Sequence, residues 1–267
     1  MRTKKVPLPK ALAIIVVSTL LISGSGYFIM RTWQKQKIKR LHDPRFFLHY
    51  IQNTSELPTS YIEELLGLSQ ESHLSYYAFS EKKARDQLLC YPYIEKAKVS
   101  KCFPQNIKVS LKLRQPFAKL LDFESTLIDE KGFLLPQFPL YQDSTFPEIY
   151  LGLKDFDPTI YREQEFWQER LSGEDFSLAM QFFKLLANRD FTLERVDLSN
   201  RTNSSLGKRE IVLILRNEDA TTHTLRLPAK SWESQLSNYI AMRQECDFFG
   251  KDRIIDLRLS SLAYITE

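Results

Sequence analysis

One short alternating segment constrains this chain more than any other. Its apolar side chains are Ile107, Val109, Leu111 and Leu113, and a polar residue separates each from the next. In a strand, successive side chains point to opposite faces, so a period of two is typical of a strand with one face on a core and one in water. The segment therefore predicts a half-buried β-strand.

The residues before this strand indicate how its core is completed. Pro92 is expected to end a helix, and Phe103–Asn106 has the composition of a tight turn. The order is then helix, strand, turn, strand. We expect one core to bury Ile94, Ala97, Val99, Ile107, Val109 and Leu111.

Two further helices and one strand are predicted upstream. Residues 46–51 are typical of a strand, and Ser60 with Glu63 forms a capping box for a helix that Gly67 ends. Ser80 is the expected N-cap of a second helix, which would bury Ala84, Leu88 and Leu89. The order strand, helix, helix, strand, strand fits a two-layer α+β domain.

The motifs of residues 88–135 occur in an order and spacing that resemble the FtsQ/DivIB family of bacterial cell-division proteins. They are Pro92-Tyr93-Ile94, Ala97-x-Val99, Phe103-Pro104, Arg114-Gln115-Pro116-Phe117-Ala118 and Ile128-Asp129-x-x-Gly132. Residues 254–259 resemble the family as well. The resemblance implies a POTRA domain over 46–115 and an FtsQ-like β domain over 116–267. One departure is Asn53-Thr54-Ser55, where members commonly have a glycine.

The C-terminal part is predicted to be rich in strands. We expect an antiparallel sheet with flanking helices, so the fold class is α+β. The predicted strands are 117–123 and 126–135 as one hairpin, 146–151 as an edge segment, then 193–198, 210–215, 222–227 and 254–259. The predicted helices are 161–171, 174–188 and one capped by Ser231.

The N-terminus carries an uncharged run of nineteen residues, Leu12–Met30. At ~1.5 Å per residue such a helix spans about one bilayer core. We therefore expect a tail at 1–11, a transmembrane helix at 12–30 and a basic linker at 31–45. A cleavable signal peptide is the alternative. An uncleaved anchor is favoured because Tyr27–Met30 continue the apolar run and a basic cluster follows.

Charge is distributed unevenly along the chain. Residues 1–40 hold nine Lys/Arg and no acid, so the net charge of +4 less these nine leaves −5 for the remainder. The basic character thus belongs to the N-terminus and does not indicate a nucleic-acid-binding face. The flanking charges alone do not establish the orientation. The resemblance implies a cytoplasmic N-terminus and a periplasmic body, in the inner membrane at the division septum.

No pattern in the sequence indicates catalysis. The four histidines are scattered without zinc-ligand spacing, and nucleotide-binding or serine-hydrolase motifs do not occur. We predict no catalytic, cofactor-binding or metal-binding residue. Cys90 and Cys102 could form a disulfide in an exported body, or all three cysteines, with Cys246, could be unpaired thiols.

Two classes of function compete. The resemblance implies a non-enzymatic membrane scaffold that binds division proteins of the FtsB/FtsL type and, through them, septal peptidoglycan synthases. The alternatives are a membrane-anchored peptidoglycan hydrolase, which would need paired catalytic groups, and a POTRA-type secretion or assembly partner, which would need tandem repeats or a barrel.

The partner site is expected near the end of the chain. A late segment can form the edge of a sheet, where unpaired backbone groups accept a partner strand. The resemblance implies the same placement, with the last strands receiving the FtsB segment. We expect Arg258 to make a charged contact and Leu259 or Tyr264 an apolar one. The predicted residues are Ile254, Asp256, Arg258, Leu259 and Tyr264.

Overall fold

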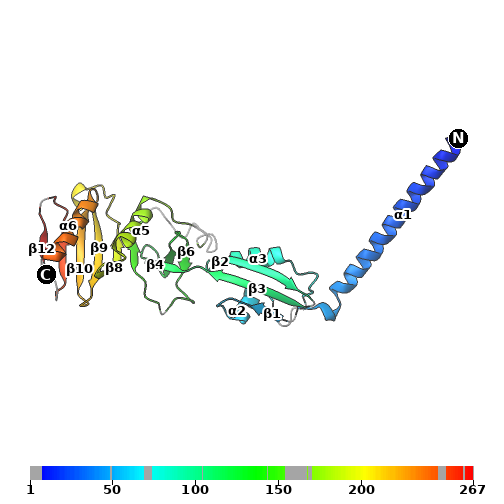
Figure 1. Ribbon diagram of the computed structural model, residues 1–267, viewed down its shortest axis with the longest axis horizontal. Coiled ribbons are helices and arrows are strands. Elements are labelled where there is room, and N and C mark those ends of the chain that lie inside the picture. Colours follow the sequence, from blue (N-terminus) through cyan, green and yellow to red (C-terminus); the bar gives the residue numbers. More distant parts are fainter. Residues whose placement is uncertain are drawn as a thin grey trace, which may run out of the picture. The chain divides into compact units, whose positions relative to one another are not determined.

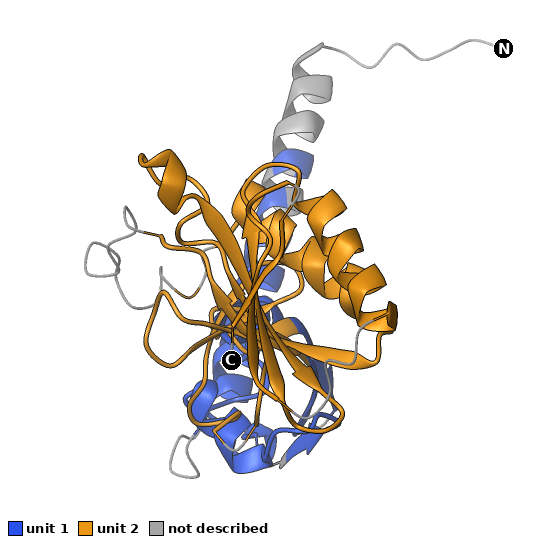
Figure 2. Ribbon diagram, turned by 90° about the vertical axis from the view of Figure 1, so that its left-hand side faces the viewer, with its two compact units in different colours: residues 1–88, 96–112 blue, residues 89–95, 113–267 orange. Residues whose placement is uncertain are grey.

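The computed structural model describes residues 8–48, 50–68, 74–103, 105–142, 144–153, 167, 170–245, 251–260 and 262–266, without the side chains of 8–17, 20–22 and 50. These residues fold into two compact units (Figure 2). The first comprises residues 1–88 and 96–112, and the second 89–95 and 113–267.

Unit 1 begins with one long helix, α1 (Leu8–Leu41), shown in Figure 1. It contains the predicted helix at 12–30 and continues through most of the predicted basic linker. Within the residues whose structure is described, no helix is both long and apolar enough to cross a membrane. The structure confirms a helix over 12–30. The crossing of a membrane by this helix stays a prediction.

The first strand begins later than predicted. Residues Pro44–Phe46 form a short 3-10 helix, η1, because proline fixes φ and the Asp43 side chain accepts a hydrogen bond of 3.1 Å from the Arg45 N–H. Strand β1 is Tyr50–Asn53. The prediction of a strand over 46–51 was thus wrong at its start.

Two helices follow, as predicted: α2 (Thr59–Leu65) and α3 (Glu81–Leu89). The capping box at Ser60 was wrong, because α2 begins directly after Pro58 without a side-chain cap. The cap at Ser80 is confirmed by a bond of 3.4 Å from the Lys83 N–H to its hydroxyl. Ala84 and Leu88 are buried, whereas Leu89 is 40% exposed, contrary to prediction.

Within the described residues, unit 1 contains a three-stranded sheet of order β1-β3-β2, with β2 at Ile94–Cys102 and β3 at Asn106–Leu113. The alternation predicted for β3 is confirmed, since Ile107 and Val109 are fully buried. Of the six predicted core residues only Ala97 is not buried. One hydrogen bond links the two helices, in which the Gln87 side-chain amide donates to the Leu65 carbonyl at 2.8 Å.

Unit 2 is built on one large sheet, whose order among the described residues is β12-β11-β10-β9-β8-β7-β4-β5-β6. The strands are β4 (Pro116–Leu120), β5 (Thr126–Asp129), β6 (Leu134–Pro136), β7 (Glu148–Tyr150), β8 (Phe191–Asp197), β9 (Glu210–Asn217), β10 (Thr222–Pro228), β11 (Arg253–Asp256) and β12 (Tyr264–Thr266).

The sheet corrects two predictions. It is mixed instead of antiparallel, since β7 runs parallel to both β4 and β8, and β11 runs parallel to β10. Residues 146–151 were predicted as an edge segment, but β7 lies inside the sheet and Ile149 is fully buried. The physical reason is that β8 pairs with the side of β7 that β4 leaves open, with Val196 opposite Ile149.

Helices α5 (Glu174–Leu186) and α6 (Trp232–Glu245) cover one face of this sheet (Figure 2). The rings of Phe182 and Trp232 meet at 4.5 Å between centroids and join the two helices over the core. The predicted helix at 161–171 lies mostly outside the described residues.

The predicted hairpin of 117–135 is two hairpins in series, β4-β5 and β5-β6. Asp129 ends β5 and accepts bonds from the N–H groups of Lys131 and Phe133 at 2.9 and 2.8 Å. Gly132 has a φ of +87°, and a Cβ there would collide with the Leu171 carbonyl. This motif glycine is therefore required by the turn itself.

We predict that Val109→Asp destabilises unit 1 by several kcal/mol, because it places an unpaired charge in a dry core. Chemical denaturation measures the loss. The matched control is Lys108→Asp, on the exposed face of the same strand, which should unfold close to the parent. Equal stability of the two variants would show that the burial assigned to β3 is wrong.

Candidate partner-binding edge

Strand β12 forms one edge of the large sheet as far as the chain is described. It pairs antiparallel with β11, with Ile255 opposite Ile265 and Asp256 opposite Tyr264. An edge strand presents backbone N–H and C=O groups on its outer side that a further strand can pair with. The predicted edge segment 254–266 therefore contains the edge strand β12, but β11, which carries Ile254 and Asp256, is an inner strand paired with both β10 and β12.

Three of the five predicted site residues have large apolar side chains, and the other two, Asp256 and Arg258, are charged. Ile254, Leu259 and Tyr264 are 45%, 64% and 70% exposed, so these large apolar side chains lie at the surface near this end of the sheet. Between them, Ile255 and Leu257 are buried in the core and hold β11 to the sheet. Alternation along β11 therefore anchors one set of side chains and leaves the other at the surface.

Arg258 and Asp256 belong to an ion-pair network on the sheet. The Arg258 guanidinium donates from Nε and Nη2 to the two carboxylate oxygens of Asp256 at 2.9 and 2.6 Å. It also lies 3.3 Å from Glu210 on β9. Arg226 on β10 bridges the same two acids, at 2.7 Å from Glu210 and 3.5 Å from Asp256.

This network favours the charged forms of Asp256 and Arg258. Burial raises the pKa of Asp256, but hydrogen bonds from the Arg258 side chain and backbone, with the charge of Arg226, hold that pKa below its ordinary value. The same hydrogen bond to Asp256 raises the pKa of Arg258. Arg258 was predicted to contact a partner, and in this structure its guanidinium is already engaged within the chain.

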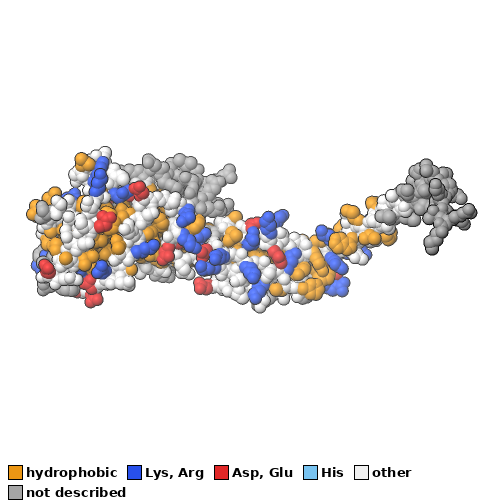
Figure 3. Space-filling model, turned by 45° about the horizontal axis from the view of Figure 1, so that its top comes forward, with side chains coloured by type: hydrophobic (Ala, Val, Ile, Leu, Met, Phe, Trp, Pro, Cys, Tyr) orange, Lys and Arg blue, Asp and Glu red, His pale blue; other side chains and the backbone are white. Residues whose placement is uncertain are grey.

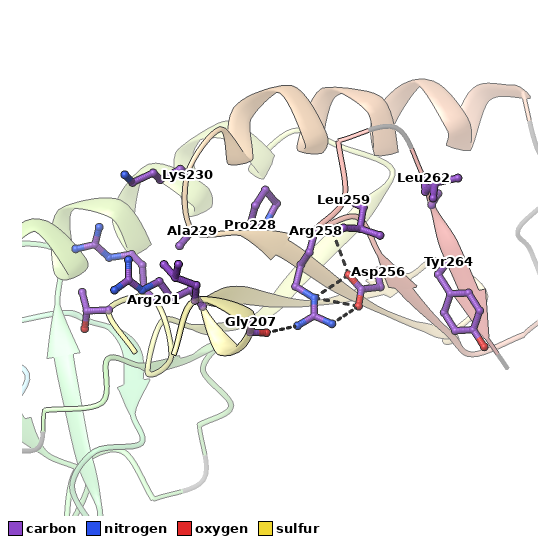
Figure 4. Close-up of a pocket in the computed structure, with 14 residues that line it drawn as sticks. Arg201, Gly207, Pro228, Ala229, Lys230, Asp256, Arg258, Leu259, Leu262 and Tyr264 are labelled. Atoms are coloured by element: carbon purple, nitrogen blue, oxygen red, sulfur yellow. Dashed lines mark hydrogen bonds and ion pairs between the residues drawn. The ribbon is translucent and has the colours of Figure 1, made fainter. Parts of the chain in front are cut away.

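A pocket of about 1020 Å³ lies beside this edge. Figure 4 shows Asp256 and Arg258 near its middle, Arg201 and Lys230 at one end, and Leu262 and Tyr264 at the other. Its lining is Arg201, Thr202, Leu206, Gly207, Arg209, Pro228, Ala229, Lys230, Asp256, Arg258, Leu259, Leu262, Ala263 and Tyr264. Three separate parts of unit 2 build it: the loop before β9, the end of β10 and the segment between β11 and β12.

The charged side chains around the pocket are mainly cationic. Among the described lining residues Asp256 is the acid, against four Lys or Arg. Two cations have partners outside the pocket network: Arg201 pairs with Asp175 and Glu174, and Arg209 donates to the Asn203 carbonyl at 2.6 Å. Lys230 is exposed. An apolar surface rimmed by positive charge suits a segment that carries apolar and acidic side chains.

Sequence reasoning missed several residues of this site. Leu206 and Leu262 are 76% and 65% exposed, and Lys230, Glu210 and Arg226 supply charge. Polar and apolar residues alternate along β9 and β10, so the polar ones could have been assigned from the sequence to the solvent-exposed face of the sheet. Which of them meet across strands depends on register, which the sequence does not reveal.

In the described part of the chain, no cluster of three His, Cys, Asp or Glu residues could hold a metal ion. Cys102 is a free thiol, so it forms no bridge to Cys90, and Cys246 lies outside the described residues.

Comparison with known proteins identifies the domain in unit 1. Residues 50–112 match the family described as POTRA domain, FtsQ-type. This range spans β1, α2, α3, β2 and β3. No curated protein matches the chain.

We predict that Arg258→Gln makes unit 2 more sensitive to acid. Because the folded-state pKa of Asp256 is depressed, its stabilising contribution is present above the unfolded pKa of about 3.9 and is lost as pH falls through the folded value. Without Arg258 this pKa rises, so acid unfolding should begin at higher pH, with a cost near pH 7 of about 1 kcal/mol because the pair is partly exposed.

Circular dichroism during acid titration measures this shift. The matched control is Arg216→Gln, which removes a cation that is 53% exposed and pairs with Glu194 on the neighbouring strand. An acid transition that moves equally in both variants would argue against a special role of the Asp256 network.

Proposed function

Because the chain carries a POTRA domain of FtsQ type, which supports its assignment to the FtsQ/DivIB family, we propose that it is a non-enzymatic scaffold of the bacterial division machinery. In this proposal it binds membrane division proteins of the FtsB/FtsL type at the septum. Through them it regulates the septal peptidoglycan synthases. The observation that carries the proposal is the FtsQ-type POTRA match, since domains of this type are typically protein-interaction modules.

The proposed binding site is the edge formed by β12 and the pocket beside it. An incoming strand would pair with the outer side of β12, and main-chain hydrogen bonds would supply affinity. Leu259, Leu262 and Tyr264, each at least 64% exposed, would supply apolar anchors. The internal Arg258–Asp256 pair would keep the edge rigid before the partner arrives, which lowers the ordering cost of binding.

The charge of the pocket supports a partner segment with acidic residues. Lys230 and Arg209 lie on the pocket lining, and both add positive potential where an apolar segment would rest. Attraction of this kind accelerates encounter and weakens as salt is added.

Membrane anchoring is a further part of the proposal. It is supported by the uncharged run of Leu12–Met30 and by the lysines and arginines on both sides of it. The N-terminus would be cytoplasmic, and the two units would lie in the periplasm.

We predict that the double substitution Leu259→Ser and Tyr264→Ser abolishes recovery of coiled-coil division proteins in co-purification from membranes. Both side chains are exposed, so thermal unfolding should stay close to that of the parent. Truncation after Arg253 is a poorer test, because it removes the buried Ile255 and Leu257 and with them the support of the sheet.

Leu185→Ser is the matched control, since Leu185 is a 47% exposed leucine on α5, away from the pocket lining. It should recover partners at the level of the parent. Normal recovery by the double variant would place the partner site elsewhere, on the POTRA domain.

We also predict that a reporter enzyme active only after export is active when fused to the C-terminus of the full chain. The reason is that a single span with a cytoplasmic N-terminus delivers everything after about residue 42 across the membrane. A reporter that works only in the cytoplasm, fused at the same position, provides the control. Activity of this second reporter would contradict the proposed topology.

A further inference from the structure

Unit 1 displays a cluster of aromatic rings that its fold does not bury. The aromatic patch consists of Phe46, Tyr76, Tyr77 and Phe103, which come from η1, the loop before α3 and the turn between β2 and β3. Phe103 is 71% exposed, and the other three are partly exposed. A phenylalanine this exposed contributes little to the core, so the patch needs an explanation other than folding.

The rings form a continuous row of edge-to-face contacts. Phe46 and Tyr77 lie 5.1 Å apart at 71°, Tyr76 and Tyr77 5.5 Å apart at 86°, and Tyr76 and Phe103 6.1 Å apart at 87°. This geometry is favourable for aromatic pairs and holds the rings in a defined arrangement. The surface is therefore preorganised.

Hydrogen bonds to backbone carbonyls tie the three segments of the patch together. The Tyr76 N–H donates to the Phe46 carbonyl at 2.7 Å, and the Gln105 amide donates to the Arg45 carbonyl at 2.5 Å. The Ser75 hydroxyl donates at 3.4 Å to the carbonyl of Arg40, in the last turn of α1. The patch thus adjoins the end of the long helix.

Two cations lie directly on these rings. The Arg40 guanidinium carbon is 5.8 Å from the centre of the Tyr77 ring, and the Lys101 ammonium is 5.1 Å from that of Tyr76. In Figure 3 hydrophobic and basic side chains gather where α1 meets the rest of unit 1. Residues 31–40 of α1 add cations and no acid: Arg31, Lys35, Lys37, Lys39 and Arg40.

We propose that the aromatic patch docks on the headgroups of an anionic lipid bilayer. Tyrosine and tryptophan rings favour the membrane–water interface, and each neighbouring Lys or Arg adds attraction to anionic lipid. The surface combines both features, with Phe103 as the apolar group able to enter the interface. A zwitterionic surface would lack the electrostatic part, and the place of the patch beside the end of α1, which contains the uncharged run Leu12–Met30, favours a bilayer over an acidic protein.

The inference rests on the anchoring part of the proposed function. If residues 12–30 span the bilayer, the ten residues from Arg31 to Arg40 rise ~15 Å above its hydrocarbon core. Headgroups occupy roughly 5–8 Å on each side, so α1 must tilt for the patch to touch them. Docking would then hold the POTRA domain close to the membrane and fix how the rest of unit 1 is presented.

The test uses the full chain reconstituted in vesicles of phosphatidylcholine, with or without phosphatidylglycerol. In one variant Phe103→Trp adds a fluorophore, and lipids brominated near the headgroup quench it on contact. We expect the added fluorescence to be quenched in the phosphatidylglycerol vesicles and the quenching to weaken at high salt. Arg40→Gln and Lys101→Gln should each lower the equilibrium constant for docking about fivefold.

Phe138→Trp is the matched control, since Phe138 is 54% exposed and belongs to unit 2. Its added fluorescence should not be quenched. Equal behaviour of the two tryptophan variants in vesicles that hold the chain would overturn the docking while leaving the anchor intact. Failure of the parent chain to float with the vesicles would overturn both, and recovery of division partners tests the scaffold separately.

Discussion

The apolar face shared by β8, β9 and β10 is the constraint on which unit 2 depends. Val196, Leu213 and Leu225 are fully buried on it, one from each strand. Helices α5 and α6 bury their apolar sides against this face, where Phe182 and Tyr239 are also fully enclosed. Since each fully buried side chain of this size contributes about 1.5–3 kcal/mol, the central strands supply the free energy that the margin at β12, which has no buried residue, lacks.

The margin at β12 carries the surface that we assign to binding. On the opposite face, ion pairs cross from strand to strand, including Glu148 with Arg195 and Arg226 with Asp256. Each exposed pair contributes little by itself, yet the series extends to Arg258 and holds it against Asp256 at the end of β11. The edge can therefore remain open for a partner strand without losing its shape, because its support comes from buried Ile255 and Leu257 and from this network.

Departures from the predictions follow from particular residues. A strand was predicted over 193–198, and the structure has β8 at Phe191–Asp197, where the buried Leu193 and Val196 are three residues apart. The structure inserts a bulge between Leu193 and Arg195, so that Leu193 and Val196 still face the core. Ala97 was predicted to be buried and is only partly buried. A small apolar residue can match a sequence pattern without being required in the core, so packing alone decides whether it is covered.

The sequence by itself determined the POTRA element order, the helix begun at Ser80, the burial of Ile107 and Val109, and the late position of the edge segment. These features depend on neighbours in the chain or on a period of two, which are local properties. Tertiary structure alone decided that β7 lies inside a mixed sheet, that Arg258 is engaged with Asp256, and that Phe46, Tyr76 and Phe103 meet in one patch. Such outcomes depend on register and on contacts between distant segments, which no local pattern encodes.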